Sequence, residues 1–167
     1  MPKFAANLAM MFNEHDYPHR FAAAAAAGFK GVESLFPYAE SIEDTKSWLS
    51  DSELELVLIN MPGGDWTNGE RGLTCLPGRQ GEYRDAIAKA IEYALAIGCC
   101  NIHSVAGLAP ESGPERMPYE DTFRENLSWA VEQMAPLDLN LMIEPINGKR
   151  DVPGMFLQTT AQARDII

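Results

Sequence analysis

The stretch Leu-Glu-Leu-Val-Leu-Ile-Asn at positions 54–60 opens the segment of the chain that decides the fold class. Its second half lacks polar alternation, which is typical of a strand buried on both faces of a parallel sheet. Residues 61–78 are rich in glycine and proline, and a loop of this length in a compact protein is usually functional. Residues 80–97 then place apolar side chains at helical spacing, and Gly98 follows them. These segments predict one strand–loop–helix unit.

The same succession recurs in both directions from this unit. The other expected strands are the apolar runs at 4–8, 31–35, 102–106 and 139–143. The other expected helices cover 17–27, 42–49, 119–134 and a segment that begins at 160. Alternating strands and helices predict right-handed parallel βαβ units, of which the chain holds about five.

Two architectures use such units. A doubly wound open sheet normally carries a glycine-rich turn after its first strand, but residues 7–12 contain no glycine. An eight-stranded (β/α)8 TIM barrel gathers functional side chains at the carboxyl ends of its strands and takes about 250 residues. The pattern favours the barrel, present over residues 1–167 as a single domain and a partial barrel of about five units.

Composition excludes several classes of protein. The 167 residues carry a formal net charge of -11, which disfavours nucleic acid and anionic membrane surfaces as partners. No apolar run approaches the ~20 residues that a membrane helix needs, and the N-terminus lacks a signal-peptide pattern. The three cysteines form neither a disulfide framework nor a CxxC metal motif. We expect a soluble cytoplasmic protein.

Polar residues recur where the expected strands end: Asn7, Glu33, Asn60, His103 and Glu144. Because the carboxyl ends of parallel strands share one edge of the sheet, these side chains are candidates for one site. For Asn7 and Glu33 a structural role is the preferred interpretation. His103 fits a substrate contact and a hydrogen-bonded core histidine equally well, and Asn60 either orients substrate or satisfies loop backbone.

Four segments resemble the hydroxypyruvate isomerase family of xylose isomerase-like TIM barrels. They are Phe-Ala-Ala-Asn-Leu-Ala-Met-Met-Phe (4–12), Gly-Phe-Lys-Gly-Val-Glu-Ser-Leu-Phe-Pro-Tyr (28–38), the whole stretch 60–79, and Ile-Glu-Pro-Ile-Asn (143–147). The match covers essentially the whole chain and the first two thirds of the family's length. 2-Oxo-tetronate isomerase is a close relative with the same framework, and its substrate is the nearest alternative to hydroxypyruvate.

The resemblance implies an isomerase that moves a proton between adjacent carbons of hydroxypyruvate to give tartronate semialdehyde. It also implies two catalytic glutamates beside a divalent metal ion such as Mg²⁺ or Mn²⁺. Glu144 matches the first glutamate, as acid–base group and metal ligand. The second glutamate and the other ligands have no counterpart among residues 1–167, so the ligand set is incomplete. A carboxylate suits the proton transfer, and a hard cation with oxygen ligands suits the enediolate charge.

The loop at 61–78 adds three candidates for contact with a small 2-oxo or hydroxy acid: Trp66, Glu70 and Arg71. The guanidinium group of an arginine is the usual bidentate partner of a carboxylate. The alternative is that Arg71 pairs with Glu70 or Asp65 and fixes the loop. A glycine-rich loop that follows a barrel strand also suits a lid that excludes water.

Two further interpretations stay open. A metal-dependent nuclease belongs to the same barrel superfamily, but it needs a basic groove that a charge of -11 disfavours. Alternatively, the chain is a catalytically inert partial barrel that associates with itself as a homo-oligomer, because open sheet edges favour association.

Overall fold

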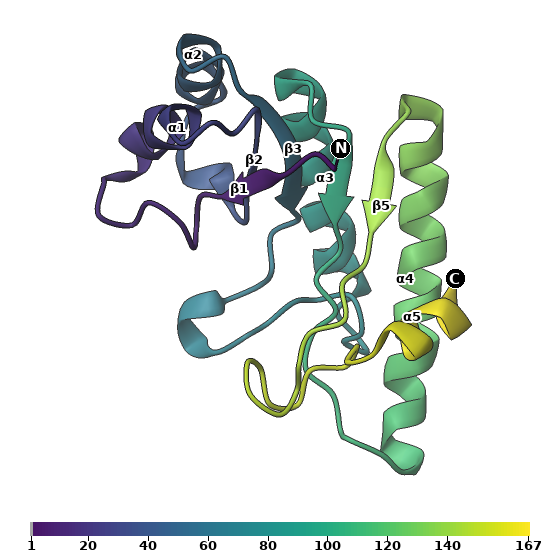
Figure 1. Ribbon diagram of the computed structural model, residues 1–167. Helices are drawn as coiled ribbons and strands as arrows, with labels where there is room; N and C mark the ends of the chain where they lie inside the picture. Colours follow the sequence, from purple (N-terminus) through teal and green to yellow (C-terminus); the bar gives the residue numbers. More distant parts are fainter. Residues whose placement is uncertain (1) are drawn as a thin grey trace.

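The computed structural model describes residues 2–167 and contains one five-stranded parallel sheet in the order β1-β2-β3-β4-β5 (Figure 1). The strands are β1 (Ala5–Asn7), β2 (Gly31–Ser34), β3 (Glu55–Asn60), β4 (Asn101–His103) and β5 (Asn140–Met142). The α-helices are α1 (Tyr17–Ala26), α2 (Ile42–Asp51), α3 (Gln80–Ile97), α4 (Met117–Met134) and α5 (Thr160–Ile166). Short 3-10 helices are η1 (Pro37–Ala39), η2 (Trp66–Asn68), η3 (Pro114–Arg116) and η4 (Ala135–Leu137). Strand order equal to chain order is the order of a TIM barrel, here with five of its strands.

Helices α1 to α4 pack against one another in chain order along one side of the curved sheet (Figure 1). Strands β1 and β5 are the two edges of the sheet. Among residues 2–167, no helix is both long enough and apolar enough to cross a membrane.

Local sequence signals explain where several elements begin and end. The hydroxyl of Ser41 accepts a hydrogen bond from the backbone N–H of Asp44, so it caps the start of α2. Gly98 ends α3 with φ +83°, a left-handed conformation that glycine adopts without steric cost. These two signals mark the start of α2 and the end of α3.

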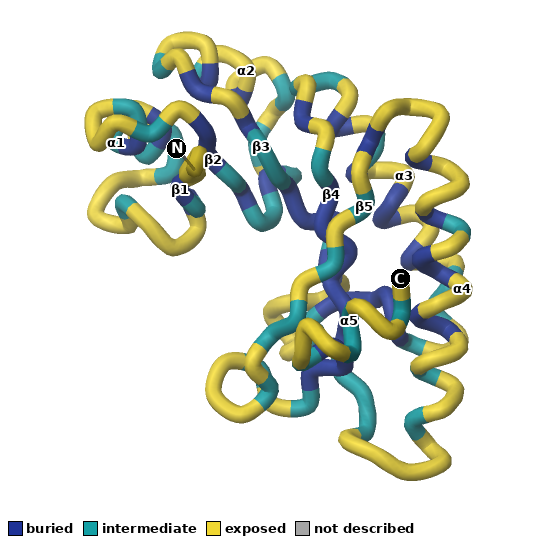
Figure 2. Tube along the Cα trace, turned by 45° about the vertical axis from the view of Figure 1, so that its right-hand side comes forward, coloured by how far each residue is buried: buried dark blue, intermediate teal, exposed yellow. Residues whose placement is uncertain are grey.

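Buried apolar side chains form two clusters. The larger lies between the sheet and the helices and includes Phe21, Val32, Ile59, Ile87 and Ile102. The smaller lies beyond the carboxyl ends of the strands, where loop residues pack on α4: Cys75, Ala106, Phe123, Leu127, Met155, Phe156 and Leu157. Figure 2 shows buried stretches in the loops beyond the strands as well as within the sheet. The loops at this end therefore have a packed base.

The fourth strand is shorter than its apolar run predicts. The expected range 102–106 is wrong at its end, because β4 stops at His103. The backbone N–H of Ser104 still donates to the carbonyl of Met142 in β5, but the next two residues bond to the long loop instead: Cys75 N–H donates to the carbonyl of Ala106 at 2.8 Å, and Gly72 forms an antiparallel bridge with Ala106. His103 is therefore the last residue of its strand rather than a residue in its middle.

Candidate active site

Three of the predicted residues meet at the carboxyl ends of neighbouring strands. Asn60 and His103 end β3 and β4 and are paired in the parallel register. The Nδ1 atom of His103 lies 3.0 Å from Oδ1 of Asn60 and 4.0 Å from Oε2 of Glu144, which follows β5. Both groups that face Nδ1 are acceptors, so the proton of a neutral imidazole is assigned to Nδ1. The sheet thus brings together an amide, an imidazole and a carboxylate.

The imidazole of His103 is almost completely buried, with 4% of the residue exposed. Burial disfavours the charged form and lowers the pKa of His103 to about 4, so the ring is neutral at neutral pH. Its Nε2 atom is the one buried side-chain nitrogen or oxygen among residues 2–167 that has no hydrogen-bond partner. A buried polar atom without a hydrogen-bond partner costs roughly 1–3 kcal/mol. Such atoms are rare in folded proteins, and a catalytic role is one of the explanations for them.

The side chain of Glu144 is 67% exposed and faces the open side of the strand ends. Partial burial raises its pKa above the ordinary value, and the negative charge of Glu33 raises it further. Glu33 lies at a register shift in β2, where the pairing with β3 skips Val57. Such irregularities reorient side chains beside functional sites. A raised pKa makes a carboxylate a stronger base, which suits a group that takes up and returns a proton.

Asn7 has a structural contact of its own. Its Oδ1 atom accepts a hydrogen bond from the backbone N–H of Ala9 at 3.0 Å, and its carbonyl accepts two more from Met10 and Met11. These bonds form the turn after β1, which supports the structural interpretation of Asn7.

The residues of the site do not make a metal centre by themselves. Within the described part of the chain, no three His, Cys, Asp or Glu side chains are grouped so that they could hold a metal ion. Glu144 is the acidic side chain beside His103, and Asn60 has its oxygen directed at the imidazole. The metal-binding role of Glu144 remains a prediction.

The loop between β3 and α3 is fastened to the end of β4. Thr74 donates its hydroxyl proton to the carbonyl of Val105 at 2.7 Å and lies 2.9 Å from the hydroxyl of Ser104. Tyr83 on α3 reaches the same serine hydroxyl at 3.1 Å, and Asn126 on α4 donates to the carbonyl of Thr74. All of these side chains are buried. The base of the loop is therefore fixed, and its exposed tip lies around η2.

The loop candidates occupy different surroundings. The guanidinium carbon of Arg71 lies 4.6 Å from the ring centroid of Trp66, and Trp66 packs on Phe36 with 4.9 Å between ring centroids. Glu70 instead pairs with Arg79 at the start of α3, and this contact lowers the pKa of Glu70. The alternative that Arg71 pairs with a loop carboxylate is wrong. The chain turns into α3 so that Arg79, rather than Arg71, forms the ion pair with Glu70. The substrate-binding roles of Trp66, Glu70 and Arg71 remain predictions.

Sequence reasoning did not single out the polar network of Thr74, Ser104, Tyr83 and Asn126 or the anchoring Arg79. A hydroxyl or amide side chain carries no periodic signal, and its partners lie 21 or more positions away, as for Tyr83 and Ser104. For Arg79, the acidic residue Glu82 three positions later, at helical spacing, was an available signal.

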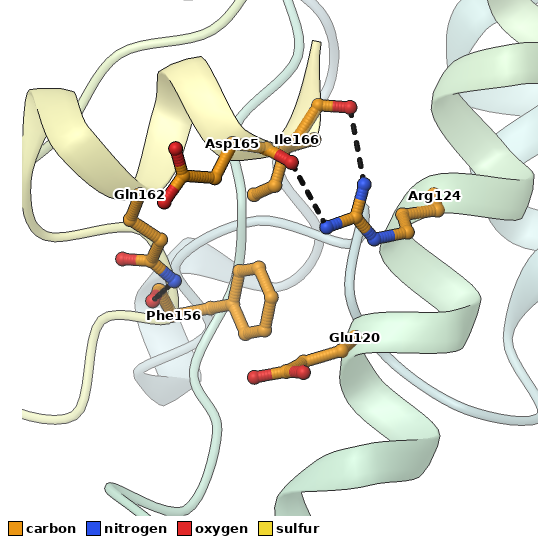
Figure 3. Close-up of a pocket in the computed structure, with 6 residues that line it drawn as sticks. All are labelled: Glu120, Arg124, Phe156, Gln162, Asp165 and Ile166. Atoms are coloured by element: carbon orange, nitrogen blue, oxygen red, sulfur yellow. Dashed lines mark hydrogen bonds between the residues drawn. The ribbon is translucent and has the colours of Figure 1, made fainter.

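Two further hollows lie away from this site. Figure 3 shows a cavity of about 310 Å³ between α4 and α5, where Arg124 donates to the carbonyls of Asp165 and Ile166. These are terminal carbonyls of α5, so Arg124 caps the helix. The second hollow lies at the opposite, amino-terminal ends of β1 to β3, beside Lys30 and Glu55.

Comparison with known proteins agrees with this architecture. A family model described as xylose isomerase-like TIM barrel matches residues 21–167. Hydroxypyruvate isomerase of Escherichia coli is 45% identical over 167 residues, which are 100% of this chain and 64% of that protein. A 2-oxo-tetronate isomerase of Cupriavidus necator is 48% identical over 94% of this chain and 60% of its own length.

A solved structure gives the same result for the backbone. The crystal structure described as AP endonuclease, family 2, from Brucella melitensis superposes with a TM-score of 0.94 at 41% sequence identity. The superposition covers 99% of this chain and 63% of that one, so the partial barrel coincides with part of a longer chain. The chain therefore belongs to the xylose isomerase-like TIM barrel family and is similar to isomerases of small hydroxy-2-oxo acids, of which it spans under two thirds.

Proposed function

We propose that the strand-end site serves the isomerisation of a small hydroxy-2-oxo acid, with hydroxypyruvate and its conversion to tartronate semialdehyde as the leading case. The observation that carries the proposal is the juxtaposition of Glu144, His103 and Asn60 at the ends of β5, β4 and β3. The identity to hydroxypyruvate and 2-oxo-tetronate isomerases supports this class of substrate. A 2-oxo-tetronate is the alternative substrate.

The proposed reaction needs a group that removes a proton from carbon. Glu144 takes a proton from C3 of hydroxypyruvate, and the electron pair of that C–H bond forms the double bond of an enediolate. The hydroxyl proton moves from the oxygen on C3 to the oxygen on C2, and a proton returned to C2 gives the aldehyde. The raised pKa of Glu144 suits both halves of this transfer. The neutral imidazole of His103 donates its Nδ1 proton to Oδ1 of Asn60 and lies 4.0 Å from the carboxylate of Glu144, whose charge it does not neutralise.

A divalent metal ion, if bound, supplies electrostatic stabilisation of the enediolate oxygens. The described residues do not complete a ligand set for it, so no step above depends on the ion. In this proposal Glu144 is the ligand that the chain contributes.

The test compares Glu144→Gln with Glu132→Gln, which removes an exposed carboxylate on α4. Each variant is assayed with hydroxypyruvate and with a 2-oxo-tetronate, in the presence of Mg²⁺ or Mn²⁺. A chimera that joins residues 1–167 to the remaining third of the E. coli relative provides a closed barrel for the same assay. We expect Glu144→Gln to reduce turnover by roughly 10²–10⁴-fold and Glu132→Gln to leave it unchanged. Equal turnover by both variants contradicts the assignment.

We also infer that the chain forms a homo-oligomer through its sheet edges. Among residues 2–167, strands β1 and β5 have a neighbouring strand on one side only; Phe4, just before β1, is 74% exposed and Met142, in β5, is 42% exposed. Open edges and exposed apolar side chains favour association.

A further inference from the structure

The side chain of Arg71 is immobilised but not neutralised. Its Nη1 donates to the carbonyl of Trp66 at 3.0 Å and to the carbonyl of Glu70 at 2.7 Å, and its guanidinium plane lies against the indole of Trp66. Among residues 2–167, Nε and Nη2 of Arg71 have no hydrogen-bond partner, and no carboxylate lies within 4 Å of its nitrogens. These two nitrogens form one edge of the guanidinium group, the edge that binds a carboxylate with two parallel hydrogen bonds.

The nearby acidic side chains are engaged elsewhere. Glu70 pairs with Arg79 and accepts from the backbone N–H of Asp65. Asp65 accepts from the backbone and the side-chain amide of Asn68. Although the chain has a net charge of -11, the two acidic side chains of the loop are bound to other partners and do not pair with Arg71. The positive charge therefore remains available to an anion.

Packing holds the stacked pair in place. A Cβ atom at Gly63 would lie 3.0 Å from the Trp66 ring and 3.2 Å from the Phe36 ring, so the absence of a side chain at this position permits the stack. Trp66 is 39% exposed, which leaves one part of the stack at the surface. A guanidinium group that is already ordered loses less conformational entropy when it binds a ligand.

The pair lies at the same end of the sheet as the candidate active site. Gly63 is three residues beyond Asn60, and Gly72, next to Arg71, bridges Ala106, three residues beyond His103. The chain segments after β3, β4 and β5 extend together from the arrowheads of the strands (Figure 1). The loop that carries Arg71 thus leaves the sheet at the strand ends that also bear Asn60 and His103.

We propose that Arg71, held on Trp66, binds the carboxylate of the substrate through its Nε and Nη2 atoms. The identification of that carboxylate with a 2-oxo acid rests on the proposed function. The site itself needs no chemical step, so it is testable with pyruvate, which has the carboxylate and the 2-oxo group but no hydroxyl group to support isomerisation.

The experiment uses Trp66 as a reporter. The chain has three tryptophans, so the Trp48→Phe/Trp129→Phe variant keeps Trp66 as the single one. Titration with pyruvate follows its fluorescence, and calorimetry on the unmodified chain measures the affinity without a reporter. Arg71→Met removes the charge at similar length, and Arg71→Lys keeps the charge but not the planar donor pair. Arg84→Met is the control in calorimetry on the otherwise unmodified chain, because Arg84 also lies over a tryptophan ring, 5.3 Å from the centroid of Trp129.

We expect saturable binding that falls at least tenfold in Arg71→Met, falls less in Arg71→Lys, and is unchanged in Arg84→Met. Pyruvamide, which lacks the carboxylate, is expected not to bind. Absence of saturable binding, equal binding by Arg71→Met in a variant whose circular dichroism is native, or equal binding of pyruvamide overturns the proposal. So does equal affinity for inorganic phosphate, since that result indicates a general anion site.

The two proposals fail in different ways. If Arg71-dependent binding of pyruvate is present while Glu144→Gln leaves isomerisation unchanged, the catalytic assignment is wrong and the carboxylate site stands. If Glu144→Gln abolishes turnover while Arg71→Met leaves pyruvate binding unchanged, the carboxylate site is wrong and the isomerase assignment stands.

Discussion

The buried imidazole of His103 predicts a loss of stability in mild acid. Its pKa is about 4 in the folded chain, against an ordinary value of 6.5. As the pH falls below 6.5 the unfolded chain therefore takes up a proton that the folded chain does not. The stability contributed by neutral His103 is fully present above pH 6.5 and is lost progressively as the pH falls toward 4.

The size of this effect follows from the two pKa values. A shift of one unit corresponds to 1.36 kcal/mol, so the full effect is about 3 kcal/mol. Most of the interval between the unfolded and folded pKa values of His103 lies between pH 7 and pH 5. Over this change of pH, the expected decrease in unfolding free energy from this residue is about 2 kcal/mol. Such a decrease is a sizeable fraction of the stability of an ordinary domain.

Urea unfolding monitored by circular dichroism at pH 7 and pH 5 measures the effect. His103→Gln keeps an amide donor for Asn60 but does not titrate, so we expect its unfolding free energy to decrease by about 2 kcal/mol less than that of the unmodified chain. His15→Gln removes an exposed histidine and is the control for the loss of a histidine at the surface. Parallel pH dependences for the unmodified chain and His103→Gln would refute the reasoning, whatever the stability of the variant at pH 7.

Two further predictions concern the loop base and the sheet edges. Gly72 has φ +113°, and a Cβ atom there would lie 2.3 Å from the carbonyl oxygen of Val105, so Gly72→Ala is expected to lower the unfolding free energy by roughly 3 kcal/mol. Gly78→Ala, at φ +79° with open space around its Cβ, should cost about 1 kcal/mol, and equal losses in urea unfolding would contradict the steric argument. Self-association through β1 and β5 predicts a sedimentation coefficient that rises with protein concentration; a monomer throughout argues against it.

Much of the architecture was predictable because it depends on local patterns. Apolar runs and helical spacing predict the five strands and their helices, and the structure confirms the parallel order. The end of β4 was not predictable, since Val105 and Ala106 are apolar but bond to the loop instead of to a strand. Hydrophobicity reports burial and does not say which backbone satisfies the peptide groups.

The candidate site was likewise predictable only in part. The polar residues at the strand ends were identifiable individually, because a parallel sheet gathers its carboxyl ends at one edge. Their geometry was not: the contact of His103 with Asn60 depends on register across 43 positions. The partners of Glu70 and Arg71 depend on the path of the loop into α3.

The sequence by itself thus determined the class of fold, the polar residues at the strand ends and the acidic surface that disfavours nucleic acid. Periodicity, glycine placement and charge are properties of short segments, which the chain carries before it folds. Only the tertiary structure decided that His103 is neutral, that Glu144 faces Glu33, and that Arg71 lies on Trp66 with one edge available. Protonation and pairing depend on distances and burial between segments far apart in the chain, and these exist only once the sheet and its loops are assembled.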